Sequence, residues 1–572
     1  MLWLAAIIFL RALSFWLYTD WHLFVVIDIC VLASLVSVLL KNQVSIAVTA
    51  WRLLKRQDYR RQKLQFNLAI GSDIIRLIGS MFSFFWFFRW AQANFDYTQM
   101  NPSQSDWAYL DAYILCSLLA YLMNAKRLSR LLEKIQFSSG RQALIHFVIA
   151  IFVGGFLLMM PFSIQDHQSI SLVDAFFLSV SALSVTGLSP VDISLVLSDW
   201  GMLILLVLIQ LGGLGVVMLT LGILVATSKR LSMNSVFLGQ GNFAINNIGD
   251  VQRFLGRTVA ITFVIEAIGA LLLYLSFPKD LPNRVFSSIF HSISAFCNAG
   301  FSLYSNSVQN PVFLDGGIFI LCVLIILGGI GFPVMIEIGK MVNRRRLSIN
   351  LLTPQSRLAI NVTSILLLSG TCLFFIFESI NPASPLSLFD KLLNSFFYSV
   401  SSRTAGFGLF PLDKMSEAFQ FFFIILMIIG ACPSSTGGGV KTTTLGVLFA
   451  TVKSVLLGRD QTLIYDRAVP LEVIRKALAI IFLYLSFAGV SLLVLIITEK
   501  SSVIGLLAEV VSALSTVGSS LNVTPQLSVI GKLVIMLLML IGRFGILSLV
   551  SAGFGDGSKS KLKYPEDQFT VG

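Results

Sequence analysis

Charged residues are scarce in this sequence, and their scarcity excludes an ordinary soluble fold. Asp, Glu, Lys and Arg make up 12% of the 572 residues, whereas soluble domains carry roughly 25%. Hydrophobic residues make up 56%, and the mean hydropathy is +0.84. Several windows of about 20 apolar residues are long enough to cross a bilayer as helices. We therefore expect an all-α integral membrane protein with many crossings.

Residue types that serve catalysis or metal binding are also scarce. The chain has four histidines and six cysteines. The cysteines lie far apart, mostly inside apolar runs, and form no CxxC pair, so we expect small buried hydrophobes rather than metal ligands. No Ser/His/Asp set and no nucleotide-binding domain is evident. We therefore expect no enzyme, no cofactor and no resident metal. A membrane-embedded enzyme would need clustered ionisable residues, which the sequence does not show.

The N-terminus, "MLWLAAIIFLRALSFWLY", lacks a basic leader and a small-residue cleavage site, which predicts a retained helix rather than a signal peptide. We expect an N-terminal region over 1–135 that contains four helices, near 2–18, 22–40, 67–90 and 106–124. Four helices before a pore are typical of a voltage sensor, but the last of them lacks the regularly spaced arginines that voltage sensing needs. We expect a packing or assembly role for this region.

The net charge of +12 predicts membrane topology rather than nucleic-acid binding. Basic residues concentrate in the short segments 51–63, 126–141 and 340–346, whereas 161–199 contains four aspartates and no Lys or Arg. The positive-inside rule places the basic segments in the cytoplasm. With eight crossings after residue 141, both termini are then cytoplasmic, and we expect a multi-pass protein of the plasma (inner) membrane.

Two glycine motifs recur four times along the chain. The first motif occurs as "SALSVTGLSP" (181–190), "SAFCNAGFSL" (294–303), "SSRTAGFGLF" (401–410) and "SALSTVGSSL" (512–521). We expect its glycines, Gly187, Gly300, Gly406 and Gly518, to occupy the same point of each unit; they are 113, 106 and 112 residues apart. The second motif lies in the helix that follows, as "LGGLG" (211–215), "LGGIG" (327–331), "IGACP" (429–433) and "IGRFG" (541–545).

The two glycine motifs recur together, at similar spacing, four times. This predicts four copies of one structural unit. The repeats run over about 141–230, 250–345, 355–457 and 472–553, within a core of 136–555 that a short cytoplasmic tail, 556–572, follows. A short helix too brief to span precedes each first motif, at 174–184, 285–296, 389–402 and 505–515. Non-helical backbone at membrane depth is tolerated where it is buried in protein or lines a water-filled cavity. Glycine lets carbonyls turn toward an axis, so four such loops predict a cation pore.

The motifs "SVTGL", "CNAGFS", "RTAGFG", "TVGSSL", "QLGGLG", "PSSTGGGVKTTT" and "GRFG" resemble those of the Trk/Ktr/HKT superfamily of potassium transporters, over roughly 141–555. The resemblance implies four membrane–pore-loop–membrane units around one pore, with K⁺ as the transported ion. In that superfamily a serine in place of the first filter glycine goes with sodium preference, and all four positions are glycine here. The resemblance also implies a homodimer gated by a separate cytoplasmic nucleotide-binding ring. The basic inner loops could meet that ring or anionic membrane lipid.

Motif matching assigns the ion-binding selectivity filter to twelve residues: Val185, Thr186, Gly187, Asn298, Ala299, Gly300, Thr404, Ala405, Gly406, Thr516, Val517 and Gly518. Their backbone carbonyls would coordinate the ion, and the three threonine hydroxyls could add oxygens. We expect Arg403, just before the third filter segment, to bond structural groups behind its loop.

The stretch "GACPSSTGGGVKTTT" (430–444) resembles a phosphate-binding loop but fails its spacing. Such a loop needs lysine directly after the last glycine, and Val440 separates Gly439 from Lys441. We expect instead a helix that Pro433 ends, followed by a hinged gating loop. The resemblance implies an intramembrane gate at this place. The gate residues are Pro433, Ser434, Ser435, Thr436, Gly437, Gly438, Gly439 and Lys441, together with Arg543 as a mid-helix barrier in the pathway below the filter.

Other charged residues leave alternatives open. A buried arginine costs several kcal/mol unless paired or hydrated, so Arg543 is either a permeation barrier or a residue bonded only to loop carbonyls. Glu266 is either a proton or sodium coupling site or a hydrogen-bonded packing residue. Glu337 is a weaker candidate near a cytoplasmic helix end. Asp174 and Asp390 are expected to cap pore helices.

The sequence thus predicts potassium uptake through a channel-like, glycine-lined filter with a gating loop in the third repeat. A sodium channel, or a potassium symporter coupled to sodium or protons, is the alternative, because the filter sequence does not decide coupling.

Overall fold

The computed structural model describes residues 139–545 apart from 166–167, 216–247, 314–315, 344, 346–347, 349–350 and 381–386. Chain contacts divide the protein into Met1–Trp107 and Ala108–Gly572, and all described residues belong to the second unit. The predicted N-terminal helices, the end of the first repeat and the tail at 556–572 lie outside the described residues.

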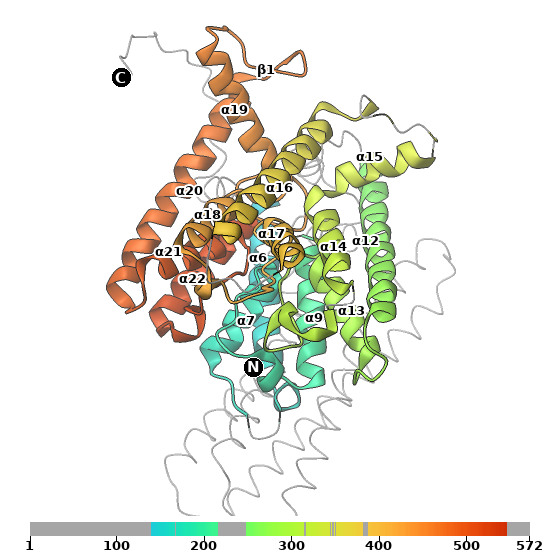
Figure 1. Cartoon of the computed structure of the whole chain (residues 1–572), viewed down its shortest axis with the longest axis vertical. Helices are drawn as coiled ribbons and strands as arrows, with labels where there is room; N and C mark the ends of the chain where they lie inside the picture. Colours follow the sequence, from blue (N-terminus) through green and yellow to red (C-terminus); the bar gives the residue numbers. More distant parts are fainter. Residues whose placement is uncertain are drawn as a thin grey trace, which may run out of the picture. The chain divides into compact units, whose positions relative to one another are not determined.

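The described chain is almost entirely helical (Figure 1), so the predicted all-α fold is confirmed. The longer elements are α6 (Ser139–Leu158), α7 (Leu172–Ser184), α8 (Ile193–Val196), α9 (Asp199–Gly213), α12 (Ile248–Ser276), α13 (Arg284–Phe296), α14 (Gly317–Ile330), α15 (Phe332–Asn343), α16 (Pro354–Ile380), α17 (Leu388–Ser401), α18 (Glu417–Ile428), α19 (Thr442–Leu456), α20 (Leu471–Thr498), α21 (Val503–Ser515) and α22 (Val529–Phe544). Short 3₁₀ turns are η1 (Pro161–Ser163), η2 (Ser307–Gln309), η3 (Pro311–Phe313), η5 (Leu412–Lys414) and η6 (Thr524–Gln526). Strands β1 (Leu463–Ile464) and β2 (Arg467–Ala468) pair antiparallel.

Four short helices, α7, α13, α17 and α21, lie where the sequence predicts pore helices, and we keep that name for them. Serine begins three of them: Ser171, Ser387 and Ser502 each accept a hydrogen bond from the backbone N–H three residues on. Asp174 and Asp390 were expected to be the caps but lie in the third position of their helices. Each instead accepts a bond from the serine hydroxyl at 2.7 Å. Their negative charge near a helix N-terminus is also favourable.

Each pore helix packs against the helix before it and, in three repeats, by the same small contact. A pore-helix serine donates to a carbonyl of the preceding helix: Ser179 to Ile151, Ser292 to Glu266 and Ser399 to Leu367, at 2.7–2.8 Å. A glycine of that helix makes room for the hydroxyl, because an added Cβ would lie 2.5 Å from it: Gly154, Gly269 and Gly370. In the fourth repeat Val510 occupies the serine position.

The helix after each filter packs against the pore helix of the next repeat. Helix α9 contacts α13, α14 contacts α17, α18 contacts α21, and α22 contacts α7. The last contact joins the fourth repeat to the first, so the pore helices form a closed cycle around one centre.

The second glycine motif ends helices instead of lying inside them, which corrects the expectation from sequence. Its fifth residue has a positive φ in three repeats: Gly215 at 87°, Gly331 at 98° and Gly545 at 81°. Left-handed backbone ends an α-helix, and glycine adopts it without steric cost. At Gly331 the chain bends by 103° between α14 and α15. A break in the second repeat was not predicted, because only the third motif carries a proline.

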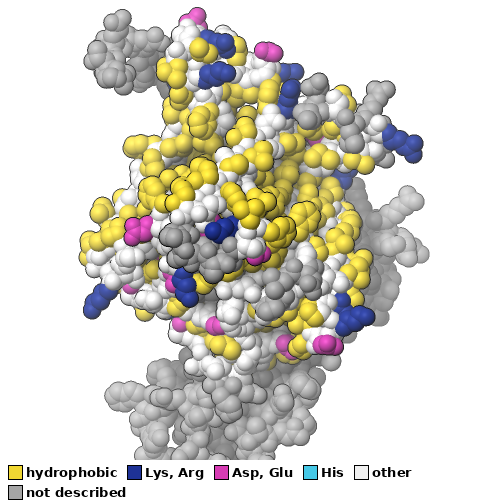
Figure 2. Space-filling view, in the orientation of Figure 1, with side chains coloured by type: hydrophobic (Ala, Val, Ile, Leu, Met, Phe, Trp, Pro, Cys, Tyr) yellow, Lys and Arg dark blue, Asp and Glu magenta, His cyan; other side chains and the backbone are white. Residues whose placement is uncertain are grey.

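Three helices, at 256–276, 354–380 and 471–498, are long and apolar enough to cross a membrane, and the bent pair α14–α15 makes up to a fourth. Large apolar side chains point outward from them, including Ile365, Leu368, Phe482 and Ile497, each at least 64% exposed. Hydrophobic side chains dominate the face drawn in Figure 2. Such a surface is stable against lipid rather than water.

Candidate functional site: a glycine ring above a broken helix

A left-handed residue follows every pore helix. Val185, Asn298, Thr404 and Thr516 have φ values of 57°, 59°, 73° and 51°. This conformation costs a β-branched residue 1–2 kcal/mol, so its fourfold recurrence shows that the surrounding structure fixes it. The turn directs the next two residues of each filter segment toward the centre of the cycle.

The four filter glycines form a closed ring in the order of the repeats. All have positive φ, between 70° and 97°. A Cβ added to any one of them would lie within 3 Å of the carbonyl oxygen that precedes the next repeat's glycine. Gly187 faces Ala299, Gly300 faces Ala405, Gly406 faces Val517, and Gly518 returns to Thr186. Only glycine permits this approach of backbone to backbone, and in each repeat it brings the glycine against a carbonyl of the next repeat.

A serine on each pore helix holds the filter segment from behind. Ser181 and Ser512 accept from the N–H of the filter glycine at 3.1 and 3.0 Å. Ser294 and Ser401 donate to the carbonyl of the residue after the glycine at 2.8 and 2.7 Å. The repeated serine therefore fixes the filter backbone in all four repeats.

The third filter segment is one residue shorter than the others, which corrects the expected register. Its glycine follows the serine by five residues, and the other three follow by six. The backbone hydrogen bond of the residue before each glycine is shorter by one residue in the third repeat as well. The Ala405 N–H donates to the carbonyl four residues back. Thr186, Ala299 and Val517 instead donate five residues back.

The three filter threonines direct their hydroxyls to protein partners. Thr186 pairs with Ser184 at 2.7 Å. Thr404 bonds the side chain of Asn298 at 3.2 Å, in either orientation of that amide. Thr516 accepts from the N–H of Gly438 at 3.0 Å. The last bond joins the fourth filter directly to the broken helix of the third repeat.

The helix of the third repeat ends at Ile428, five residues before Pro433, which was expected to end it. The chain then folds back on itself: Gly430 N–H donates to Val440 at 2.9 Å, and Ala431 N–H donates to Gly438 at 3.3 Å. This pairing ends the helix before the proline. We call residues 429–441 the gating loop.

Gly430 occupies the predicted register but a different environment. An added Cβ at Gly212, Gly328 or Gly542 would strike the carbonyl of Leu183, Phe296 or Leu514 near a pore-helix end, whereas at Gly430 it would strike Gly438 of its own loop. The third repeat thus replaces a helix–helix contact by a contact within the gating loop.

Bonds to the second repeat hold the gating loop. Cys432 and Thr436 donate from their N–H groups to Gly329 and Gly328 at 3.0 and 3.3 Å. The Thr436 hydroxyl donates to the Phe296 carbonyl at the end of pore helix α13, at 3.3 Å. Ser434 has a positive φ of 57°, and its carbonyl accepts from Phe332 at 3.0 Å. The Ser435 hydroxyl is buried without a hydrogen-bond partner among the described residues.

Three cationic side chains lie in or against the gating loop, and each donates to a carbonyl oxygen; Arg403 also bonds the side chain of Cys432. Arg543 donates to the carbonyls of Thr436 in the loop and of Gly212 in the first repeat. Lys441 donates to Gly437 at 2.6 Å and to Gly438 at 3.3 Å. Arg403 donates to Gly430 at 3.4 Å. Among the described residues no carboxylate lies within 4 Å of any of the three.

The structure therefore brings the predicted gate residues and Arg543 together below the filter. It places Arg543 in the last turn of α22 rather than mid-helix, because Gly545 ends that helix. A cation there also interacts favourably with the helix dipole.

Glu266 is a buried carboxylate beside the second filter. It accepts from Gln210 of the first repeat at 3.2 Å, and the Cys297 thiol lies 3.7 Å away. Cys297 directly precedes Asn298 of the filter. Glu337 instead accepts from the N–H and hydroxyl of Thr353 at 3.1 and 3.0 Å, just before α16, which is a structural role.

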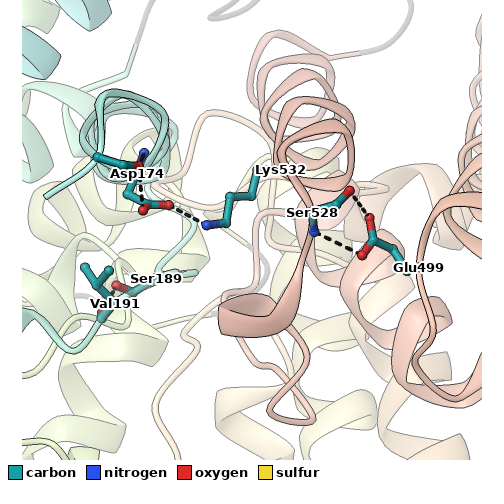
Figure 3. Close-up of polar contacts among 7 residues, drawn as sticks. Asp174, Ser189, Val191, Glu499, Ser528 and Lys532 are labelled. Atoms are coloured by element: carbon teal, nitrogen blue, oxygen red, sulfur yellow. Dashed lines mark hydrogen bonds and ion pairs between the residues drawn. The ribbon is translucent and has the colours of Figure 1, made fainter.

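An ion pair joins the fourth repeat to the first. Lys532 of α22 contacts Asp174 of α7 at 2.6 Å, and both side chains are largely shielded from solvent (Figure 3). Nearby, Glu499 at the end of α20 accepts from the N–H and hydroxyl of Ser528 at 3.0 and 2.5 Å. Sequence reasoning missed the ion pair of Lys532 with Asp174 because the two residues are 358 positions apart.

Comparisons with known proteins identify the family and the fold. The family TrkH, described as "Cation transport protein", matches residues 108–553. The potassium/sodium uptake protein NtpJ of Enterococcus hirae is 34% identical, covering 74% of this chain and 95% of that protein. The Ktr system potassium uptake protein B of Bacillus subtilis is 33% identical, covering 77% and 99%.

Among solved structures, the potassium transporter TrkH of Vibrio parahaemolyticus matches with a TM-score of 0.60 at 20% identity, covering 84% of this chain and 98% of that one. This likeness shows the shared fold. With the family match over most of the chain, and with relatives above 30% identity, the chain belongs to the TrkH family of transmembrane cation transport proteins.

Proposed function

We propose that this chain is the membrane subunit of a potassium uptake system and that ions pass through the ring of filter glycines. The closed cycle of close approaches between glycines and carbonyls carries the proposal. Four carbonyl oxygens gathered at one point, from Thr186, Ala299, Ala405 and Val517, can replace water around a cation. Four pore helices direct their negative C-terminal ends to the same centre. The potassium uptake that both curated relatives are named for supports this choice of ion.

The gating loop closes the pathway below the filter in this proposal. Arg543, Lys441 and Arg403 supply positive charge there, and among the described residues no carboxylate lies within 4 Å to neutralise it. A permeating cation meets both a steric block and electrostatic repulsion. To open the pathway, the gating loop must break the bonds from Arg543 to Thr436 and from Thr436 to Phe296. The tightly packed helices can stay in place during this movement.

The proposal includes a homodimer, a regulatory ring on the cytoplasmic side and contacts with membrane lipid. The Bacillus subtilis relative is named as one protein of a system, which supports a multi-component transporter. The end of α19 and the β1–β2 hairpin expose Lys453, Arg459 and Arg467, and basic side chains gather at this end in Figure 2. By the positive-inside rule this end would face the cytoplasmic side of the plasma membrane. A regulatory subunit would bind there.

A sodium channel or a symporter coupled to sodium or protons is the second candidate. Glu266 favours it, because this buried carboxylate lies beside Cys297, the residue directly before the second filter, and a buried carboxylate there suits ion coupling. The Enterococcus hirae relative is named for sodium as well as potassium. Imposed sodium and proton gradients separate the candidates: a coupled symporter accumulates rubidium against its own gradient, and a channel does not.

The test of the proposed pathway is ion uptake by purified full-length protein in liposomes. Rubidium replaces potassium as tracer. Gly300→Ala adds a Cβ that would lie 2.7 Å from Ala405 carbonyl oxygen, whereas Gly489→Ala on α20 meets nothing within 4 Å and is the matched control. We expect wild type and the control to take up rubidium and the filter variant to lose at least tenfold. Equal uptake by all three would contradict the proposed pathway.

A further inference from the structure

One position on each pore helix is fully buried and differs in chemistry from repeat to repeat. It lies three residues before the filter serine and holds Leu178, His291, Tyr398 or Glu509 in the first to fourth repeats. We call it the anchor position. Leucine is an ordinary residue for a buried helix face, but histidine, tyrosine and glutamate are costly there unless their polar atoms are bonded.

Tyr398 bonds the chain after the third filter. Its hydroxyl donates to the Phe410 carbonyl at 2.5 Å and accepts from the Phe410 N–H at 2.8 Å. Phe410 lies four residues after Gly406. One hydroxyl therefore satisfies both backbone groups of a residue that has no helix or sheet partner, and it fixes the distance between this segment and its pore helix.

His291 makes the corresponding contacts in the second repeat. Its Nε2 lies 3.1 Å from the Ser302 hydroxyl and accepts from the Leu303 N–H at 3.4 Å. An accepting Nε2 leaves the proton of the neutral ring on Nδ1, which is 2.8 Å from the Ser287 carbonyl of the same helix. The ring stacks on Tyr304 with centroids 5.4 Å apart. The imidazole thus joins pore helix α13 to the segment after Gly300.

Glu509 does the same in the fourth repeat. Its carboxylate accepts from the hydroxyl of Ser520, two residues after Gly518, and from that of Thr524 at 2.9 and 3.0 Å. The side chain is completely buried. Among the described residues no Lys or Arg lies within 4 Å of it. Two hydroxyls of the segment after the filter are its partners, so its placement serves that segment.

The first repeat lacks this connection. Leu178 has no polar atom to offer, and the segment after Gly187 is closed on itself by a bond from the Ser189 hydroxyl to the Val191 carbonyl (Figure 3). The ring of filter glycines is thus held from the anchor position in the second, third and fourth repeats and not in the first.

We propose that His291, Tyr398 and Glu509 are positioning residues that set the ion selectivity of the ring. The inference rests on the proposed function, that ions pass between the filter glycines. Each anchor spans from the pore helix to the residues directly after a glycine, so it limits how far that glycine and its neighbouring carbonyl can move. When an anchor is removed, the carbonyls can close around a smaller ion, and discrimination against sodium falls.

The test compares single-group deletions in full-length protein reconstituted in liposomes, with rubidium and sodium uptake measured in parallel. Tyr398→Phe removes one oxygen and keeps the ring. Glu509→Leu copies the anchor of the first repeat, and Glu509→Gln keeps an oxygen that can accept from Ser520 and Thr524. Tyr484→Phe is the matched control, because it removes a buried hydroxyl that bonds Ser515 of a pore helix at 2.6 Å and no residue after a filter glycine.

We expect the rubidium-to-sodium ratio to fall about five- to thirtyfold in Tyr398→Phe and Glu509→Leu, the range that a lost buried hydrogen bond of 1–2 kcal/mol corresponds to. The ratio should stay near wild type in Glu509→Gln and Tyr484→Phe. Unchanged ratios in both anchor variants would overturn the inference, and so would an equal fall in Tyr484→Phe. Absence of rubidium uptake by the wild type would instead contradict the proposed function, so the two failures are distinguishable.

Discussion

Replacing Arg543 with alanine removes the side chain that joins residues 429–441 of the third repeat to the first repeat. Its guanidinium donates to the Thr436 carbonyl of the loop and to the Gly212 carbonyl of the first repeat. A hydrogen bond from a charged donor contributes about 1.5–3 kcal/mol. Loss of the bond to Thr436 should therefore destabilise the closed loop by about that amount, and removal of the charge lowers the electrostatic barrier as well.

A destabilisation of that size lowers the closed-to-open ratio roughly 10- to 150-fold. Rubidium uptake in liposomes, without any regulatory subunit, should rise in proportion until the open form dominates. Lysine at the same position keeps the charge but lacks the planar fork that reaches two carbonyls. We therefore expect Arg543→Lys to be leakier than wild type and tighter than Arg543→Ala.

The matched control is Arg284→Ala. Arg284 also donates to a carbonyl, that of Tyr274, and lies over the Tyr274 ring at 4.2 Å, outside the filter and the gating loop. Its loss should leave rubidium uptake unchanged. The reasoning is refuted if folded Arg543→Ala, with an elution profile like that of wild type, conducts no more rubidium than wild type or the control.

Three further predictions follow from the same contacts. Shortening the loop within 434–439 should make the transporter constitutively leaky, because the bonds from the loop to Phe332 and Gly328 cannot all form; persistent closure in a rubidium flux assay would contradict the gate. Gly518→Ala should abolish uptake while Gly489→Ala retains it, since only the first adds a Cβ against a carbonyl, that of Thr186; uptake in both would argue against the ring. Asp174→Asn and Lys532→Met should each lower the melting temperature by a few degrees, with a coupling energy of about 1 kcal/mol in the double variant; additive effects would show that the ion pair does not stabilise the closed cycle.

Much of the fold could be predicted because glycine and charge patterns report on backbone and membrane. Gly187 and its three counterparts mark points where positive φ combines with an approach of backbone that a Cβ would block, so their spacing indicated four similar units. The apolar spans of α12, α16 and α20 were long enough to identify from length alone. The family and the all-α membrane fold are confirmed.

Other features depend on contacts between residues far apart in the chain. Proline seemed to end the third helix at Pro433, but strand-like pairing of Gly430 with Val440 ends it earlier. Arg543 seemed to lie mid-helix because the motif does not show that Gly545 adopts a positive φ. The anchor position was invisible because leucine, histidine, tyrosine and glutamate share no sequence pattern. These residues are related only by their place on the pore helices, three residues before the filter serine, and that relation requires the register of the four helices.

The central claim, that this chain moves potassium through its ring of filter glycines, is tested most directly by one measurement. Purified wild-type protein and Gly187→Ser are reconstituted in liposomes, and rubidium and sodium uptake are measured under equal gradients. A serine Cβ at this position would lie within 3 Å of the Ala299 carbonyl oxygen and would disturb the ring. We predict that wild type favours rubidium over sodium and that Gly187→Ser shifts the preference toward sodium. Sodium uptake that excludes rubidium in the wild type, or identical selectivity in both proteins, would contradict the account.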